Sequence, residues 1–356
     1  MSTMSVPAHG RRQFLQALAA GALALGRLPA ADQPGAKPIR GLFPIGSSPF
    51  TDANELDLEC LAAEVRFLNR GGVHGVIWPQ IASEWTTLSK KERLDGAEAM
   101  TAAGKGGKTA IVIGVQGPDM PTVLEYAKHA EKAGADGVCS LPPANVTDDD
   151  ALFDYYRQIG SATGLPLFVQ SQPFPMSIDL IVRMYKEIPT FRQIKDEAGD
   201  TLARITEIRT RTADGVKVFT GNGVRMMINE LLLGAQGFCP TVDLADVYAQ
   251  VFDLWMSGKR AEAFDMFGRV LCFGSIVQAA GAPQKYVLVV RGVFKNTRRR
   301  GDSTGLAKPA GGGAAPSGAG AGGAGGGGPR VPHPFSAEGE KLVRDALDLL
   351  KPCLRG

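Results

Sequence analysis

Lys195 ends a short run of mainly apolar residues, 191–195, and polar and glycine residues follow it at once. An isolated ammonium is costly to bury, so a lysine at the carboxyl end of a buried strand is unusual. In an apolar pocket its pKa falls, and the neutral amine becomes a nucleophile toward carbonyl carbon. The segment alone favours a surface lysine, because lysine is seldom buried, but the rest of the chain reverses that preference.

The residues around Lys195 offer further reactive groups. Asp196 and Glu197 follow it directly and could act as acid or base, but we expect them to face the loop and to be solvated. Cys139 and Cys239 fall near the ends of predicted strands. A buried, inert thiol is the commoner role for such a cysteine.

The bulk composition describes a chain that can build a large core. Its 356 residues are 44% hydrophobic and 21% charged, which suits one large barrel or two ordinary domains. Three arginines and no acid lie in the first 31 residues, so the remainder balances 36 basic against 36 acidic residues. No basic field is left that would indicate nucleic acid or an anionic membrane as a partner.

The cysteines and histidines predict no metal site. Five scattered cysteines contain no CxxC and fit neither a disulfide framework nor a zinc site. The four histidines have no ligand-like spacing. We therefore expect neither a bound metal nor a cofactor.

The N-terminus resembles a twin-arginine export signal. Arg11 and Arg12 precede a weakly hydrophobic run at 17–25, and small residues at 28–31 form a plausible cleavage site. The run is too short to span a bilayer, which needs about 20 residues. We predict that residues 1–31 are a signal peptide and that the mature protein is periplasmic. The alternative is a fortuitous arginine pair before an amphipathic helix in a cytoplasmic protein.

From residue 40 onward, short apolar runs alternate with amphipathic stretches. The runs that predict strands are 41–45, 75–78, 109–115, 137–141, 167–170, 191–195, 217–220 and 237–239. The stretches that predict helices are 56–70, 90–103, 121–133, 149–163, 178–186, 202–212, 224–233 and 244–256. Eight such units predict a closed parallel (β/α)₈ TIM barrel over residues 40–256, within the α/β class.

A C-terminal extension follows the predicted barrel. Helices are expected at 260–280 and 284–292, within a C-terminal helical region 257–300. Residues 301–332 are rich in Gly and Ala and predict a flexible loop, with an interaction tether as a weaker alternative. A terminal helix is expected within 333–356, docking through Leu342, Ala346, Leu349 and Leu350.

Short motifs, in matching order and spacing from about residue 40 to 295, give the chain a family resemblance. They are PFT at 49–51, LD at 56–57, GGVHG at 71–75, EWTTLSKKER at 84–93, GV at 114–115, AKHAEKAGADG at 127–137, LPP at 141–143, LPL at 165–167, IKD at 194–196, GD at 199–200 and GNG at 221–223. The chain resembles the dihydrodipicolinate synthase and N-acetylneuraminate lyase family. The resemblance implies that Lys195 forms a Schiff base with a 2-oxo acid, usually pyruvate, whose iminium then acts as an electron sink.

The resemblance also assigns the remaining site residues, and several of them depart from the family pattern. In the family, a Gly-Thr-Thr-Gly-Glu loop holds the carboxylate of the oxo acid, and it corresponds here to Gln80, Ile81, Ala82, Ser83 and Glu84. Both threonine hydroxyls of the family loop are therefore absent, although backbone amides and the Ser83 hydroxyl could still bind a carboxylate. The proton-shuttling tyrosine corresponds to Gln170, which cannot act as a general acid.

The sequence does not select the replacement for this tyrosine among Ser171, Glu84 and a bound water. We assign Gln170 and Ser171 to the proton-relay position. The resemblance adds Gly221, Asn222 and Cys239 as residues lining the substrate pocket.

Two further departures argue against lysine biosynthesis. The arginine that binds the second substrate in true dihydrodipicolinate synthases corresponds to Pro175, and an aromatic pair that reaches across a subunit interface corresponds to Ala144 and Asn145. We therefore expect a Schiff-base lyase, of aldolase or dehydratase type, that acts on a 2-oxo acid or sugar-acid derivative.

The alternative is a catalytically weak or inactive barrel that binds a small carboxylate. The first hypothesis needs a Lys195 with a depressed pKa, whereas a binding protein can keep a protonated lysine. The expected partners are a small 2-oxo acid and, as in relatives, further copies of the chain in a dimer or tetramer. Neither nucleic acid nor stable membrane insertion is expected.

Overall fold

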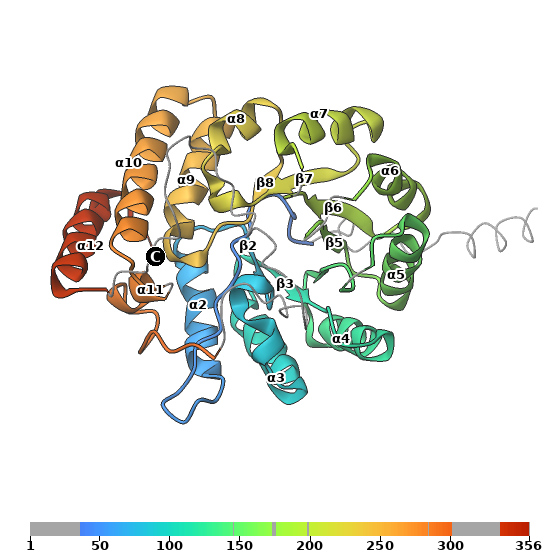
Figure 1. Cartoon of the computed structure of the whole chain (residues 1–356), viewed down its shortest axis with the longest axis horizontal. Helices are drawn as coiled ribbons and strands as arrows, with labels where there is room; N and C mark the ends of the chain where they lie inside the picture. Colours follow the sequence, from blue (N-terminus) through green and yellow to red (C-terminus); the bar gives the residue numbers. More distant parts are fainter. Residues whose placement is uncertain are drawn as a thin grey trace, which may run out of the picture.

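The protein folds as a barrel of eight parallel strands surrounded by helices, which confirms the predicted (β/α)₈ architecture (Figure 1). The computed structural model describes residues 36–144, 146–172, 176–197, 199–283, 285–300 and 335–355. The strands are β1 (Gly41–Leu42), β2 (Gly75–Trp78), β3 (Ala110–Gly114), β4 (Gly137–Ser140), β5 (Leu167–Gln170), β6 (Phe191–Lys195), β7 (Lys217–Thr220) and β8 (Gly237–Phe238). The helices of the barrel are α2 (Leu58–Arg70), α3 (Lys90–Gly104), α4 (Met120–Ala133), α5 (Asp149–Ala162), α6 (Ile178–Glu187), α7 (Thr201–Arg211), α8 (Met227–Leu232) and α9 (Ala245–Met256).

The order of the strands closes the sheet on itself. Each strand pairs in parallel with its neighbour in sequence from β2 to β8, and β8 pairs with β1. The chain just after β1 completes the ring, because Ile45 forms a parallel bridge with Ile77 of β2. All eight strands therefore end at the same mouth, where barrel active sites lie.

Local sequence explains where most of these helices begin. A side-chain oxygen at the N-cap accepts a hydrogen bond from a backbone amide three residues further on, which satisfies a donor that the helix itself leaves unpaired. The N-cap residues that do so are Asp57, Ser89, Asp119, Asp148, Ser177, Asp200 and Ser336. Capping thus fixes the starts of α2 to α7, six of the eight barrel helices, and the start of α12 (Ala337–Leu350).

Three aromatic rings fill the interior of the barrel below the mouth. Phe43, Phe168 and Phe219 are fully buried, and the centroid of the Phe219 ring lies 4.7 Å from that of Phe168 and 5.5 Å from that of Phe43. Gly237 makes room for this layer, because a Cβ there would lie 2.1 Å from the Phe219 ring. The rings form an apolar floor beneath the residues at the mouth.

The C-terminal helices pack together on one side of the barrel (Figure 1). They are α10 (Arg260–Ala279), α11 (Tyr286–Val290) and α12 (Ala337–Leu350), and they share an apolar cluster with α9. A buried bidentate ion pair joins α9 to the end of α11, since Arg291 donates to both carboxylate oxygens of Asp246 at 2.8 and 2.7 Å.

The docking face of α12 differs from the predicted one. Ala346 and Leu350 are buried as expected, but Leu342 is 50% exposed and Leu349 is 72% exposed. Val343 and Leu347 are buried instead. Positions 343, 346, 347 and 350 follow the i, i+3, i+4, i+7 spacing of a single helix face, which leaves 342 and 349 on the opposite side.

Two predicted segments lie outside the described residues: the signal peptide, 1–31, and the Gly/Ala-rich loop, 301–332. Within the part of the chain that the structure describes, no helix has the length and apolar character needed to cross a bilayer.

Replacing Phe219 with Ala should destabilise the barrel by about 3–5 kcal/mol, because it leaves a cavity in the ring layer that backbone strands cannot collapse to fill. Phe264→Ala on α10 is the matched control, since that ring is 56% exposed and its loss should cost less than about 1 kcal/mol. Urea unfolding of both variants measures the difference. Equal losses of stability would contradict the assignment of Phe219 to a packed interior layer.

Candidate active site

Lys195 lies at the carboxyl end of β6, within the mouth of the barrel. The residue is only 6% exposed. Its Nζ lies 2.9 Å from Oε2 of Glu197, and both side chains are nearly sealed from solvent, at 7% and 6% exposure. The predicted nucleophile is therefore a buried ammonium whose counter-ion comes from two residues further along the same chain.

The two acids after Lys195 do not face solvent, so that expectation was wrong. Asp196 is 1% exposed and accepts hydrogen bonds from Arg204 Nε and Ser171 Oγ, each at 2.6 Å. The backbone explains their position, because the amide of Asp196 still donates to the carbonyl of Phe219 beyond the end of β6. The segment after Lys195 thus continues along β7 and carries both carboxylates into the mouth.

The ion pair sets the protonation of Lys195. Burial by itself lowers the pKa of this amine, but the charge of Glu197 and the hydrogen bond to it outweigh burial, and the pKa lies above its usual range. The depressed pKa that the Schiff-base hypothesis required is therefore not found. Lys195 is an ammonium at neutral pH and must lose a proton before it can attack a carbonyl.

Gln170 and Ser171, assigned to the proton-relay position, contact different carboxylates. Gln170, at the end of β5, donates from Nε2 to Oε2 of Glu197 at 2.9 Å. Ser171 donates its hydroxyl proton to Asp196 and accepts a hydrogen bond from the amide of Glu197 at 3.2 Å. Gln170 therefore belongs to the Lys195 site, whereas the Ser171 hydroxyl serves the buried Asp196.

Gly221 follows β7 and lies against the ion pair. A Cβ at this position would meet Oε1 of Glu197 at 1.7 Å and Cε of Lys195 at 3.0 Å, so only glycine leaves room for the paired side chains. Asn222 begins the short 3-10 helix η4 (Asn222–Val224). The structure therefore places Gly221 at the site by steric fit to the protein's own residues.

A third carboxylate, Glu230 of α8, lies behind this group. It is 1% exposed and accepts a hydrogen bond from Thr220 Oγ1 at 2.8 Å. Burial raises its pKa to about 7, the bond from Thr220 opposes that shift, and the negative charge of Glu197 adds to it. Glu230 therefore titrates near neutral pH at the edge of the site.

The two cysteines near strand ends are buried in the same region. Cys139 is 0% exposed and Cys239 is 5% exposed. Burial raises the pKa of Cys139 to about 12 and that of Cys239 further above its usual range. Both stay neutral thiols at physiological pH, which fits an inert lining better than a nucleophile.

In the loop from Gln80 to Glu84, the Ser83 side chain stabilises the loop itself. Ile81, Ala82 and Ser83 form the 3-10 helix η2 (Ile81–Ser83). The Ser83 hydroxyl accepts from the amide of Gln80 at 2.9 Å and donates to the carbonyl of Gly46 at 2.5 Å. This hydroxyl therefore ties the loop to the segment after β1 rather than presenting itself to a ligand.

Glu84 is fixed by the C-terminal part of the chain. Its backbone is left-handed, with φ of 57°, and its side chain is buried. Lys285 Nζ lies 2.9 Å from Oε1, and the amide of Arg300 donates to Oε2 at 2.8 Å. Lys285 also donates to the carbonyl of Ser48 at 2.6 Å. Glu84 thus anchors the loop to residues 285–300, which makes it a poor candidate for the proton relay.

Glu64 of α2 is a second buried acid near this loop. It is fully buried, and its Oε1 accepts from the amide of Ser47 at 2.9 Å. Burial raises its pKa to about 8, although the Ser47 amide and the charge of Lys285 oppose the shift. Its charged form is therefore unfavourable in the folded protein over most of the acidic and neutral range.

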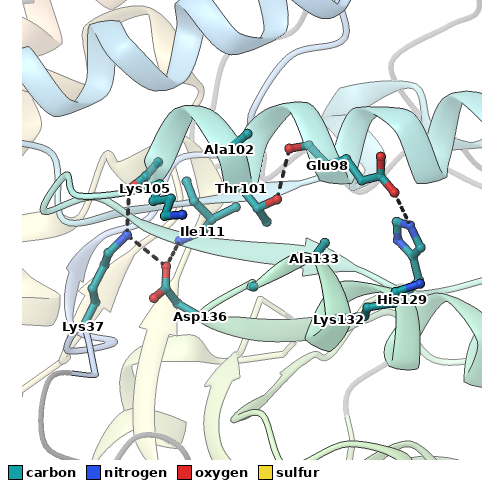
Figure 2. A pocket seen from close by; sticks show the side chains of 12 residues that line it. Lys37, Glu98, Thr101, Ala102, Lys105, Ile111, His129, Lys132, Ala133 and Asp136 are labelled. Carbon is teal, nitrogen blue, oxygen red and sulfur yellow. Dashed lines mark hydrogen bonds and ion pairs between the residues drawn. The ribbon is translucent and has the colours of Figure 1, made fainter.

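A surface cavity of about 550 Å³ lies away from this mouth, between α3 and α4 (Figure 2). Its lining includes Asp136 and Ile111 near the starts of β4 and β3, the end of the barrel opposite Lys195. Lys37 there already pairs with Asp136 at 3.2 Å (Figure 2). It also donates to the carbonyls of Gly104 and Thr109. Residues at this end of a barrel typically serve stability, so we do not assign chemistry to this cavity.

Sequence reasoning did not place four residues that the structure brings to this region: Glu197 and Glu230 lie near Lys195, and Glu64 and Lys285 lie near the loop from Gln80 to Glu84. Glu197 had a local signal, because a lysine that is buried needs a nearby counter-ion. Lys285 had none, since it reaches Glu84 across 201 positions of the chain. Among the described residues, no cluster of three or more His, Cys, Asp or Glu could hold a metal ion.

Comparison with known proteins identifies relatives of the whole barrel. Residues 38–301 match the model of the dihydrodipicolinate synthetase family. An uncharacterized DapA-like lyase from Thermococcus onnurineus is 30% identical over 225 residues, which are 58% of this chain and 74% of the relative. A 4-hydroxy-tetrahydrodipicolinate synthase from Methanothrix thermoacetophila is 27% identical over 57% of this chain and 69% of its own length.

Solved structures give the same fold. The crystal structure of a dihydrodipicolinate synthase from Rhodopseudomonas palustris superimposes with a TM-score of 0.69 at 23% identity. The match covers 87% of this chain and 97% of that one. At this level of identity the likeness concerns the architecture of the barrel.

The buried Glu64 should make stability fall with rising pH. Its folded pKa of about 8 exceeds the ordinary value of 4.5, so its stabilising effect is complete below pH 4.5 and is lost as the pH rises through 8. Relative to Glu64→Gln, which carries no charge, the wild type should lose on the order of 4 kcal/mol between pH 5 and pH 9.

Urea titrations at pH 5, 7 and 9 measure this difference. Glu59→Gln on the same helix is the matched control, because that side chain is 80% exposed. If the wild type and Glu64→Gln keep a constant difference in unfolding free energy across these pH values, Glu64 does not carry the proposed shift.

Proposed function

Because the chain belongs to the dihydrodipicolinate synthetase family, we propose that it is a lyase that forms a Schiff base between Lys195 and a 2-oxo acid. The observation that carries this proposal is the buried Lys195 at the carboxyl end of β6, in contact with a carboxylate that can accept its proton. Burying a charge at this position costs free energy, and an apolar residue could fill the same space without that cost. The presence of a buried lysine here therefore favours a functional role over a structural one.

The chemistry follows from the imine. Nζ of Lys195 replaces the ketone oxygen of the 2-oxo acid, and the protonated imine withdraws electrons from the neighbouring carbon. A bond to that carbon can then break or form, as in aldol cleavage, aldol addition or loss of water. The floor formed by Phe43, Phe168 and Phe219 excludes water from below the reacting carbon.

The substrate class is a 2-oxo acid such as pyruvate or a sugar-acid derivative. The loop from Gln80 to Glu84 lacks the threonine hydroxyls of its relatives, and Ser83 and Glu84 are held by Gly46 and Lys285. Recognition of the substrate carboxylate therefore falls to backbone amides. We propose that the enzyme is not a true dihydrodipicolinate synthase, because Gln170 occupies the tyrosine position.

One observation favours the second candidate, a barrel that binds a small carboxylate without turnover. The pKa of Lys195 lies above its usual range once burial is outweighed by Glu197, and a permanent ammonium could simply hold a ligand's carboxylate. Such a ligand would have to compete with Glu197, which already lies 2.9 Å from Nζ. This competition makes the binding function the weaker of the two.

Incubation with pyruvate and borohydride should add one reduced adduct to the wild-type protein, located at Lys195 by peptide mass. Lys195→Ala should lose the adduct because it removes the only nitrogen that the proposal uses. Lys186→Ala, which changes an exposed lysine on α6, is the control and should keep it. Tight binding of pyruvate without any adduct would favour the carboxylate-binding barrel. A panel of 2-oxo sugar acids, treated in the same way, identifies the preferred substrate.

Aspartate semialdehyde and pyruvate together should give no cyclic condensation product. The expected reason is the loss of the family tyrosine at Gln170 and of the second-substrate arginine at Pro175, a residue outside the described part of the chain. A coupled assay for dihydrodipicolinate, with an authentic synthase as positive control, measures this. Product formation above background would refute the assignment of these two positions.

A further inference from the structure

We propose that Glu197 is the catalytic proton-transfer residue, taking the role that Gln170 cannot perform. In this proposal Glu197 accepts a proton from Lys195 as the amine attacks and returns it to the oxygen that leaves. The inference rests on the proposed Schiff-base function and assigns its acid and base.

The carboxylate of Glu197 contacts Nζ of Lys195, the atom that would attack the carbonyl carbon. Oε2 of Glu197 lies 2.9 Å from Nζ of Lys195 and accepts a second hydrogen bond, also of 2.9 Å, from Nε2 of Gln170. Gln170 therefore orients the group that replaces the tyrosine. Gly221 leaves the space that the other oxygen, Oε1, occupies, since a Cβ would lie 1.7 Å from it. Direct contact within hydrogen-bonding distance is the first requirement of a general base.

The other side chains around Lys195 and Glu197 are either hydrogen-bonded elsewhere or neutral. Asp196 is held by Arg204 and by the hydroxyl of Ser171. Cys139 and Cys239 carry raised pKa values through burial and remain thiols.

Glu230 completes the electrostatic surroundings. Burial and the charge of Glu197 hold its pKa at about 7, against the hydrogen bond from Thr220, so Glu230 keeps its proton in weakly acidic solution. Of these two neighbouring acids, Glu197 is the one that pairs directly with Nζ of Lys195, at 2.9 Å.

The proton count of the imine step balances with Glu197 alone. A proton moves from Nζ to Glu197, the free amine attacks the carbonyl carbon, and the carbonyl oxygen takes the proton back from Glu197. The resulting amino alcohol passes its second N–H proton through Glu197 to the hydroxyl group, which leaves as water while the C=N bond forms. Lys195 ends as a protonated imine and Glu197 as a carboxylate, and no external acid, base or oxidant is needed.

Glu197→Gln separates proton transfer from simple charge pairing, because the two roles predict opposite effects. Without the carboxylate, burial of Lys195 is unopposed, so its pKa falls and a larger fraction of the amine is neutral. If Glu197 only held the ammonium, imine formation at pH 7 would therefore become faster. If Glu197 transfers the proton, imine formation should slow by on the order of 100-fold.

The experiment records two rates from pH 6 to 10 for the wild type, Glu197→Gln and Glu207→Gln, an exposed glutamate on α7 whose side chain is 52% exposed. One rate is reductive trapping of pyruvate, and the other is acetylation of Lys195 by acetic anhydride, which needs no proton delivered to a carbonyl oxygen. We expect Glu197→Gln to shift acetylation to lower pH and to slow trapping. Glu207→Gln should match the wild type in both.

The alternative outcomes are distinct. Trapping that is unchanged or faster in Glu197→Gln would overturn the role of Glu197 and leave the Schiff-base function intact. Loss of both trapping and acetylation would also overturn it, because Glu197 would then only position the lysine. Absence of any adduct in the wild type would remove the proposed function itself. Should Glu197→Gln fail to fold, Glu197→Ala with added formate replaces it; restored trapping supports the proposal, and no restoration in folded protein refutes it.

Discussion

The ammonium of Lys195 lies at the mouth of the barrel above a layer of buried aromatic rings, and the cost of burying that charge explains the arrangement of the residues around it. Glu197 supplies the counter-ion, and Gln170 orients it from the neighbouring strand. Gly221 must lack a side chain so that both members of the pair fit. Burial raises the pKa of the nearby Glu230 to about 7, and the negative charge of Glu197 adds to that shift.

The same residues explain how the chain can depart from its relatives and keep an ordered site. Ser83 and Glu84, in the loop that the resemblance assigns to substrate carboxylate binding, bond to Gly46 and Lys285 within the protein. The hydroxyl of Ser171 is likewise used to hold Asp196. The loop side chains Ser83 and Glu84 thus serve the structure, and the proposed reaction relies on the contact between Lys195 and Glu197.

Periodicity in the sequence predicted the barrel closely, because each strand and helix has its own local signal. The predicted strands 167–170, 191–195 and 217–220 coincide with β5, β6 and β7, and the N-cap residues fix several helix starts. The position of Lys195 at a strand end was equally readable. The orientation of Glu197 was not, because it depends on the chain continuing along β7 after β6 ends. The partnership of Glu84 with Lys285 was also invisible, since no local pattern links residues 201 positions apart.

The separation of 201 positions between Glu84 and Lys285 affects the order in which contacts can form while the chain is being synthesised. Every strand of the barrel, up to β8, is synthesised before Lys285. Until residues 285–300 emerge, the buried Glu84 lacks the ammonium and the Arg300 amide that hold it. Contacts between distant segments form late because closing a long loop of chain costs entropy first. A translation product cut short after the barrel would therefore contain all eight strands and Lys195, yet it would lack the contacts that Lys285 and Arg300 make with Glu84.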